Sequence, residues 1–221
     1  MSWVALETSS RRPSVALRRG DERREITLDG ARAHASDLVP TLDRLCAELS
    51  CAPGAVEGVL VGTGPGSYTG LRVGIATALG LVRATGAILR GVPSGETLAY
   101  GELRPGEECV FLLDARQGEL YLAHYRREGD DVAVLRAPAV VAPGDLRRLL
   151  PEGVTIFGDE TVARAATLTT AERARLRTDA VPHAAALLEL GLHRVERSGP
   201  QSPDQVEPLY LRPFAAKTRR R

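Results

Sequence analysis

The residues best suited to chemistry lie in one loop, Gly62 to Gly70, whose sequence is GTGPGSYTG. Glycines let the backbone approach an anion, and a helix that begins beyond them points its free N–H groups at that anion. The spacing fits neither the P-loop, which needs a lysine, nor the dinucleotide fingerprint, nor the nucleophile elbow of hydrolases. The loop therefore indicates either a tight turn with a helix cap or a nucleotide contact. The candidate contacts are Gly64, Gly66, Ser67 and Thr69.

Four carboxylates are candidates for holding a cation or a water. They are Glu7, Asp114, Asp159 and Glu160. Glu7 and Asp114 each end an apolar stretch that predicts a strand, and carboxylates at strand ends in a nucleotide cleft commonly serve that purpose. A single acid at a strand end is more often a hydrogen-bonded turn residue. Asp114 is the acid that we assign to a nucleotide contact.

The histidines and cysteines do not predict a metal site. His34, His124, His183 and His193 form no HxH, HxxxH or HExxH pattern. The three cysteines are an odd number without a CxxC pair, which argues against a disulfide framework and for a reducing compartment. The sequence therefore predicts no resident metal.

The 221 residues carry 29 basic and 28 acidic side chains, a balance typical of a globular chain. Four of the positive charges lie in the last five residues, which leaves the other 216 at −3. A chain with a net negative charge binds nucleic acid poorly, because nucleic acid is also negatively charged. The tail Arg219 to Arg221 is either a solvated end or an RNA contact. The chain shows no signal peptide and no apolar run long enough for a membrane span, so we expect a cytoplasmic protein.

The surrounding sequence predicts alternating strands and helices. Strands are expected at 3–8, 14–18, 26–28, 58–62, 87–92, 109–114, 119–126, 132–137 and 154–157. Helices are expected at 38–49 after an N-cap at Ser36, at 71–85, within 93–100, at 145–150, within 160–176 and at 182–197. In the last helix, Pro182 suits the first position and Gly199 suits the end.

Two segments share one plan. WVALETSSRRPSVALR and CVFLLDARQGELYLAHYR each consist of an apolar strand that ends in an acid, a turn, and a second apolar strand. Chance can produce such a pair, but it also predicts two duplicated α/β halves with a nucleotide cleft between them. We place the halves at 1–104 and 105–200, followed by a C-terminal segment with a basic tail at 201–221.

The helix expected at 71–85 is apolar on every side. It has no charged residue from Val73 to Val82, and Gly70, Gly74 and Ala78 are small residues four apart. A helix of this kind must be covered all round, and small residues at this spacing allow a second helix to approach closely. It is therefore either enclosed in the chain's own core or part of a subunit interface.

Gly64 to Gly74, with the sequence GPGSYTGLRVG, closely resembles the signature of the bacterial TsaB (YeaZ) family of tRNA threonylcarbamoyladenosine biosynthesis proteins. The opening WVALETSS is similar to the first strand of that family. The segment from His34 to Pro40 resembles the start of its first long helix. Leu113 to Tyr121 and Pro208 to Arg212, with Ala216 and Lys217, match its central and C-terminal motifs. The resemblance covers nearly the whole chain in order.

The resemblance implies an actin/Hsp70-like fold of two duplicated α/β halves and an accessory, non-catalytic role. In this family the chain binds a TsaD-type subunit, which carries the metal and the transfer chemistry, and a TsaE-type ATPase. Together they move a threonylcarbamoyl group onto the tRNA adenosine beside the anticodon. Catalytic relatives carry a metal-binding HxxxH, and Ser94 and Leu98 stand in those two positions here. Glu7 stands where the family usually has Asp, which weakens a nucleotide role for that acid.

The resemblance also implies that two helices of the first half pack against the partner. That interface would comprise Leu38, Leu42, Leu45, Leu49, Gly70, Leu71, Gly74, Ile75, Ala78 and Val82. The free chain would form a homodimer through the same surfaces, and tRNA would be met only through the complex. No cofactor is expected apart from ATP or ADP at the joint surface with the partner. The alternatives are a phosphotransferase or ATPase that acts through Asp114 and the glycine loop, and a metallopeptidase, which the missing histidines disfavour.

Overall fold

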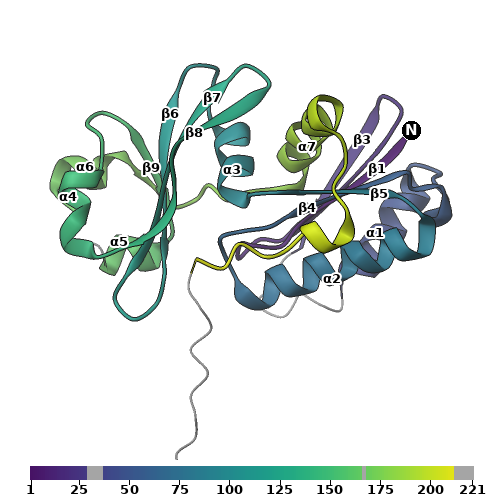
Figure 1. Cartoon of the computed structure of the whole chain (residues 1–221), viewed down its shortest axis with the longest axis horizontal. Coiled ribbons are helices and arrows are strands. Elements are labelled where there is room, and N and C mark those ends of the chain that lie inside the picture. The colour runs from purple at the N-terminus through teal and green to yellow at the C-terminus, as the bar shows by residue number, and fades with distance from the viewer. Residues whose placement is uncertain (29–36, 166–167, 212–221) are drawn as a thin grey trace, which may run out of the picture.

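In the computed structural model, which describes residues 1–28, 37–165 and 168–211, two lobes are each built on a five-stranded sheet (Figure 1). The first sheet contains β1 (Ser2–Glu7), β2 (Ser14–Arg19), β3 (Glu22–Thr27), β4 (Gly58–Gly62) and β5 (Ile88–Val92). The second contains β6 (Glu108–Asp114), β7 (Leu120–Glu128), β8 (Asp131–Val141), β9 (Thr155–Gly158) and β10 (Leu176–Arg177).

The two sheets repeat one topology. Their strand orders are β3-β2-β1-β4-β5 and β10-β9-β6-β7-β8. In each lobe the first three strands form an antiparallel meander, and the next two continue parallel to the first. The paired strand–turn–strand segments are therefore equivalent elements. The prediction of an actin/Hsp70-like fold with two duplicated halves is confirmed.

Helices cover both faces of the first sheet because its central strands are apolar on both sides. All residues of β1 and β4 are buried. Their alternate side chains meet α1 (Leu38–Glu48) and α2 (Tyr68–Thr85) on one face and α7 (Ala184–Ser198) on the other (Figure 1). α3 (Ser94–Glu102) packs with α7 and the second sheet in a core shared by both lobes. The short helices α4 (Leu146–Leu149), α5 (Glu160–Ala165) and α6 (Thr170–Arg175) belong to the second lobe.

The course of the chain departs from the division predicted at residues 104 and 200. α7 follows the second lobe in sequence but contacts β1, β2, β4 and β5 of the first. The segment beyond α7 also returns to the first lobe, where Gln201 forms a β-bridge with Leu89. The first lobe is therefore assembled from both ends of the described chain.

Several helix ends differ from the predicted ones for local reasons. α2 begins at Tyr68 because Ser67 caps it by accepting a bond from the Gly70 N–H. The helix predicted at 182–197 begins after His183, whose ring nitrogen accepts from the Ala186 N–H, so Pro182 precedes the cap. The stretch 160–176 contains two short helices, α5 and α6, which agrees with the helical stretches expected there. Ser36 and His34 lie outside the described residues.

The predicted partner-binding side chains are used within the chain. The leucine stripe of α1 and the small-residue stripe of α2 both face the first sheet, which needs them as cover. These residues are buried: Leu38, Leu42, Leu45, Leu49, Gly70, Leu71, Gly74, Ile75 and Ala78, while Val82 is half-buried. A partner cannot reach the buried set while the fold is intact, which corrects the predicted interface.

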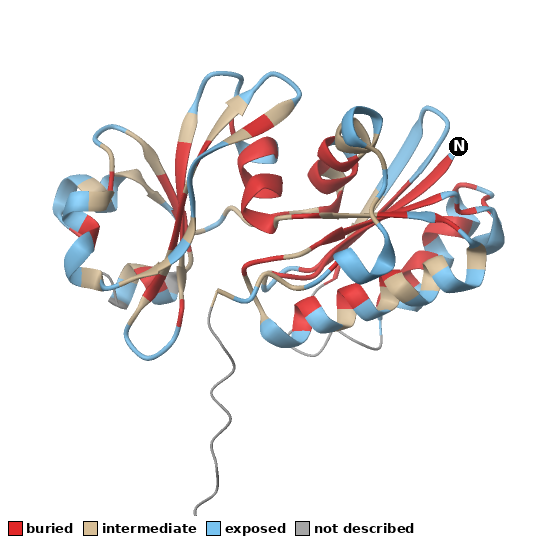
Figure 2. Cartoon of the chain, in the orientation of Figure 1, coloured by how far each residue is buried: buried red, intermediate tan, exposed pale blue. Residues whose placement is uncertain are grey.

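A different face of α2 remains outside. Ala76, Gly80 and Ala84 are exposed and lie four residues apart, and pale blue and tan alternate with red along the helix (Figure 2). On α1, Val39 is 50% exposed. Among the described residues no helix has both the length and the hydropathy that crossing a membrane requires.

Two glycines of α2 provide a matched test of this orientation. A Cβ at Gly74 would overlap Thr8 Oγ1, whereas a Cβ at Gly80 would meet no atom of the described residues within 4 Å. We expect Gly74→Ala to destabilise the fold by about 1–3 kcal/mol through overpacking. Gly80→Ala should stabilise it by up to about 1 kcal/mol through helix propensity. Urea unfolding measures both, and equal stabilities for the two variants would contradict the orientation of α2.

Candidate functional site

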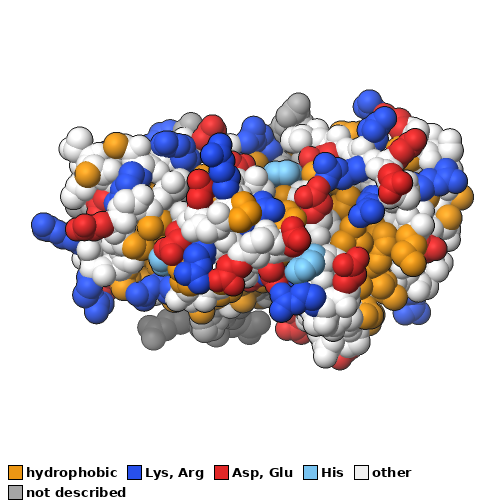
Figure 3. Space-filling model, turned by 90° about the horizontal axis from the view of Figure 1, so that it is seen from above, with side chains coloured by type: hydrophobic (Ala, Val, Ile, Leu, Met, Phe, Trp, Pro, Cys, Tyr) orange, Lys and Arg blue, Asp and Glu red, His pale blue; other side chains and the backbone are white. Residues whose placement is uncertain are grey.

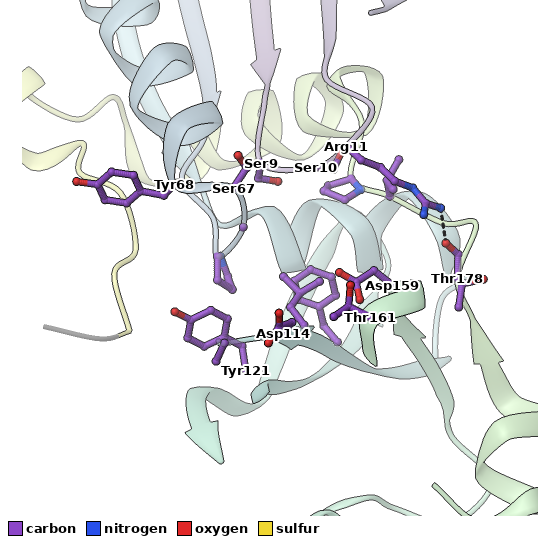
Figure 4. A pocket seen from close by; sticks show the side chains of 18 of the residues that line it. Ser9, Ser10, Arg11, Ser67, Tyr68, Asp114, Tyr121, Asp159, Thr161 and Thr178 are labelled. Atoms are coloured by element: carbon purple, nitrogen blue, oxygen red, sulfur yellow. Dashed lines mark hydrogen bonds between the residues drawn. The ribbon is translucent and has the colours of Figure 1, made fainter. Parts of the chain in front are cut away.

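A cavity of about 610 Å³ lies where the two lobes meet (Figure 4). Its walls are mainly hydroxyl, aromatic and charged side chains. The first lobe contributes Ser9, Ser10, Arg11, Ser67, Tyr68 and Thr69. The second contributes Phe111, Asp114, Arg116, Tyr121, Asp159 and Thr161. This is the cleft expected between duplicated halves.

The structure brings four of the five predicted nucleotide contacts to this cleft. Gly66, Ser67 and Thr69 line it from the first lobe and Asp114 from the second. Gly64 lies behind the loop instead. Its N–H donates to Ser94 Oγ at 3.1 Å, and its carbonyl accepts from the Ser94 N–H at 2.7 Å.

The glycines of the loop give room to the chain's own atoms. An added Cβ would overlap the Glu7 carboxylate at Gly62, the Ser9 carbonyl at Gly66 and the Thr8 carbonyl at Gly70. The Ser67 N–H also donates to the Ser9 carbonyl at 2.7 Å. These contacts press the loop against the end of β1. The glycines therefore explain a tight capped turn, and they do not form an open cradle for phosphate.

The two aspartates of the cleft have structural partners. Asp114 Oδ1 accepts from the Arg116 N–H at 2.8 Å, and its other oxygen lies 3.7 Å from the Arg116 guanidinium. Asp159 Oδ1 accepts from the Val162 N–H at 2.8 Å, at the start of α5. Both carboxylates thus stabilise a turn or a helix end. The side chain of Glu160 lies outside the described set.

Glu7 lies beneath the loop and does not line the cleft. It is completely buried, and its Oε1 accepts from the Ser9 N–H at 2.9 Å and from Ser94 Oγ at 3.2 Å. Among the described residues, its Oε2 has no hydrogen-bond partner. Burial raises the pKa of this carboxyl, because a charged group is poorly solvated there. Its equivalent in the second lobe, Asp114, is open to the cleft.

The two positions that resemble the family's metal-ligand pair are part of the packing. Ser94 is fully buried and joins the glycine loop to Glu7 through its hydroxyl. Leu98 is 1% exposed in the core shared by both lobes. Within the described part of the chain no three His, Cys, Asp or Glu side chains are grouped to hold a metal ion. His124 instead lies 2.8 Å from Glu108 Oε2.

Contacts between the lobes were not predictable from the sequence. At one edge of the cleft the Arg11 guanidinium donates to the Thr178 carbonyl at 2.7 Å (Figure 4). In the shared core Arg194 of α7 lies 2.5 Å from Glu96 of α3 and 2.9 Å from Asp131 of β8. With so many arginines in the chain, no residue pattern distinguishes these from solvated ones. Together these contacts join the two lobes on either side of the cleft.

The surface charge is mixed. Basic and acidic side chains alternate over the face seen in Figure 3, with no broad field of one sign. Proteins that bind nucleic acid through the body of a domain gather basic side chains on one face. This face of the lobes therefore does not have the charge distribution of a duplex-binding surface.

The family described as TsaD, tRNA N6-adenosine threonylcarbamoyltransferase, matches residues 28–185. A tRNA threonylcarbamoyladenosine biosynthesis protein TsaB from Haemophilus influenzae is 35% identical over 132 residues, which are 58% of this chain and 55% of that protein. The protein of the same name from Escherichia coli K12 is 29% identical over 165 residues, 71% of each chain. The solved structure of YeaZ from Pseudomonas aeruginosa superimposes with a TM-score of 0.82 at 27% identity, covering 95% of this chain and 99% of that one. The match spans about half the length of the Haemophilus relative.

The burial of Glu7 predicts a pH-dependent stability. Because its pKa is raised in the fold, its contribution is fully present below the ordinary value of 4.5 and is lost as the pH rises through the folded pKa. Glu7→Gln keeps the shape of the neutral form, so we expect it to be more stable than the native chain at pH 8 and no more stable at pH 4. Urea unfolding at several pH values measures this, with the exposed Glu196→Gln as control. A native-like pH profile for Glu7→Gln would contradict the buried carboxyl.

Proposed function

Because the chain belongs to the TsaD-type tRNA N6-adenosine threonylcarbamoyltransferase family, in its TsaB (YeaZ) branch, we propose that it is the accessory subunit that binds and activates a separate catalytic subunit. The complex would transfer a threonylcarbamoyl group to the tRNA adenosine beside the anticodon. Relatives named for tRNA threonylcarbamoyladenosine biosynthesis support this process. We place the chain in the cytoplasm, where tRNA is modified.

The observation that carries the non-catalytic role is the state of Ser94 and Leu98. The Ser94 hydroxyl is hydrogen-bonded to Glu7 and to the glycine loop. The Leu98 side chain is an apolar residue of the buried core. Neither side chain has the imidazole that binds the metal in the HxxxH motif of catalytic relatives. The two positions support the folding of the cleft wall, so the metal and the transfer chemistry would come from the partner.

The outer face of α2 fits docking of a partner helix. Ala76, Gly80 and Ala84 leave an exposed strip, and an added Cβ at Gly80 would have no neighbour within 4 Å in the part of the chain that the structure describes. No charged residue lies between Val73 and Val82, so a partner would not have to desolvate a charge there. Small residues at this spacing permit close backbone approach. We assign the TsaD-type subunit to this face, in place of the buried stripe.

The remaining partners belong to the same proposal. A TsaE-type ATPase would join the complex, and tRNA would be contacted only within it. Without the catalytic subunit, the same face of α2, together with the exposed Val39 of α1, would support a homodimer. An adenine nucleotide, ATP or ADP, would meet this chain through Ser67, Thr69 and Asp114 at the joint surface, because the loop glycines are filled by the chain's own atoms.

Reconstitution tests the accessory role. We expect tRNA to be threonylcarbamoylated by the full set of subunits and at most weakly when this chain is left out. Gly80→Leu should weaken binding of the catalytic subunit at least tenfold, roughly 1.4 kcal/mol, while keeping the fold, because leucine is a better helix former than glycine. Calorimetric titration of the two subunits measures the affinity.

The matched control is Glu196→Leu, which places the same side chain on the exposed side of α7. It should bind the catalytic subunit like the native chain. Native affinity of Gly80→Leu would show that α2 is not the docking face. Full modification of tRNA without this chain would refute the accessory role itself.

Nucleotide titration separates this role from that of a phosphotransferase or ATPase. That alternative rests on Asp114 and the glycine loop lining one cleft. We expect the chain alone to neither bind ATP stoichiometrically nor hydrolyse it, and the assembled complex to bind it. Stoichiometric binding and turnover by the chain alone, abolished by Asp114→Ala, would establish the alternative instead.

A further inference from the structure

Two tyrosines and an arginine form a stacked cluster at the start of α2, which we name the Tyr–Arg patch. The rings of Tyr68 and Tyr210 have centroids 5.5 Å apart at an interplanar angle of 30°. The guanidinium carbon of Arg72 lies 4.3 Å from the Tyr68 centroid and 5.9 Å from that of Tyr210. Arg72 Nε also donates to the Tyr210 hydroxyl at 2.9 Å. The three side chains therefore fix one another's positions.

The patch lies at the surface of the first lobe. Tyr68 is 42% exposed, Tyr210 is 44% exposed, and Arg72 is exposed as well. Tyr68 points from the first turn of α2 toward the C-terminal segment (Figure 4), which is held in place because the Leu209 N–H donates to the Thr63 carbonyl at 2.8 Å. Side chains that are fixed before binding lose little conformational freedom on binding. Tyrosine and arginine are also among the residues that most often dominate the affinity of protein interfaces.

The charge of Arg72 has no acidic partner among the described residues. Its guanidinium contacts two aromatic rings and a hydroxyl there, and it forms no ion pair with a carboxylate. The other charged residue of α2, Arg83, lies in the last turn, where it complements the helix dipole. Arg72 lies near the beginning of the helix, where that dipole does not favour a cation. The described chain therefore leaves Arg72 without an opposite charge beside it.

The patch continues the strip of α2 that we assign to the catalytic subunit. Five exposed residues follow one another at intervals of four and form a single ridge of the helix: Tyr68, Arg72, Ala76, Gly80 and Ala84. The last three are the small residues of the proposed docking face. Arg72 precedes Gly80 by eight residues, which is about 12 Å along the helix axis. A partner helix packed on the small residues would therefore extend to the Tyr–Arg patch.

We propose that Arg72 binds an aspartate or glutamate side chain of the catalytic subunit, at the end of the docking face and beside the two tyrosine rings. This inference rests on the proposed function and names the chemistry of the partner's surface. A guanidinium binds a carboxylate through two parallel hydrogen bonds. Rings that exclude water around such a pair strengthen its attraction, because the local dielectric constant falls.

Charge complementarity selects the occupant. α2 contains two arginines and no acid, and the strip from Val73 to Val82 between them is uncharged. A surface that packs on this helix must be apolar along the strip and acidic where it meets Arg72. A folded protein can present both features on one helix, whereas the phosphates of RNA would complement the arginines and leave the apolar strip uncovered.

Calorimetric titration of the two subunits at low and high salt tests the charge pair. We expect Arg72→Gln to weaken the binding of the catalytic subunit about tenfold at low salt and to bind with less dependence on salt than the native chain. Arg72→Lys keeps the charge without the planar fork and should lose less affinity. The control is Arg148→Gln, which makes the same change of charge on α4, where Arg148 is 79% exposed. It should bind like the native chain.

Cross-linking with a carbodiimide, which joins an amine to a carboxylate in contact with it, identifies the acid. The native sequence has a single lysine, Lys217, so few amines compete. With Arg72→Lys we expect an adduct of this chain and the catalytic subunit, in which the new amine at position 72 is joined to an aspartate or glutamate of the partner. Arg148→Lys should give no such adduct. Mass spectrometry of the digested adduct locates both ends.

Each contrary outcome has a distinct meaning. Native affinity and native salt dependence of Arg72→Gln overturn the inference. A lower melting temperature of the free Arg72→Gln chain with unchanged affinity shows that the patch only ties Tyr210 to α2, and it overturns the inference as well. Adducts between two copies of this chain, or none with the catalytic subunit although the complex forms, do the same. If Gly80→Leu weakens the complex and Arg72→Gln does not, the docking face stands and the charge pair fails; if neither variant weakens it, both fail.

Discussion

The structure depends on the need to bury both faces of one sheet. β1 and β4 present apolar side chains on each side, so neither face of the first sheet can be left in water. α1 and α2 satisfy one face and α7 satisfies the other. The leucine stripe of α1 and the small residues of α2 are buried against this sheet for that reason. The same requirement also draws the acid at the end of β1 under the adjoining loop, away from solvent.

The same constraint determines what remains of the cleft. The architecture that usually frames a nucleotide is present, with a glycine loop on one wall and an acid on the other. Two of its polar side chains accept short-range bonds: Ser67 from the first turn of α2, and Asp114 from its own turn. These bonds fix the loop and the turn that form the two walls of the cleft.

Much of this fold was accessible from sequence because it is local. The strand 58–62, the apolar helix after the glycine loop and the repeated strand–turn–strand plan follow from periodicity and turn residues. The face of α2 that meets the sheet did not follow, since Gly74 and Gly80 both belong to a series of small residues four apart. Only the fit of Thr8 into the notch at Gly74 decides between them. The placement of α7 and the Arg194 contacts depend on long-range packing, which a single sequence does not encode in any readable pattern.

The path of α7 has a consequence for biosynthesis. The ribosome completes β1 to β5 by Val92, yet the helix that covers their second face begins only at Ala184. While the second lobe is being translated, the apolar face of the first sheet that α7 covers in the folded protein has no helix packed on it. At elongation speeds of about 5–20 residues per second, that interval lasts roughly 5–20 seconds. Nascent chains of this protein therefore keep that apolar face of the first sheet uncovered until α7 has been synthesised.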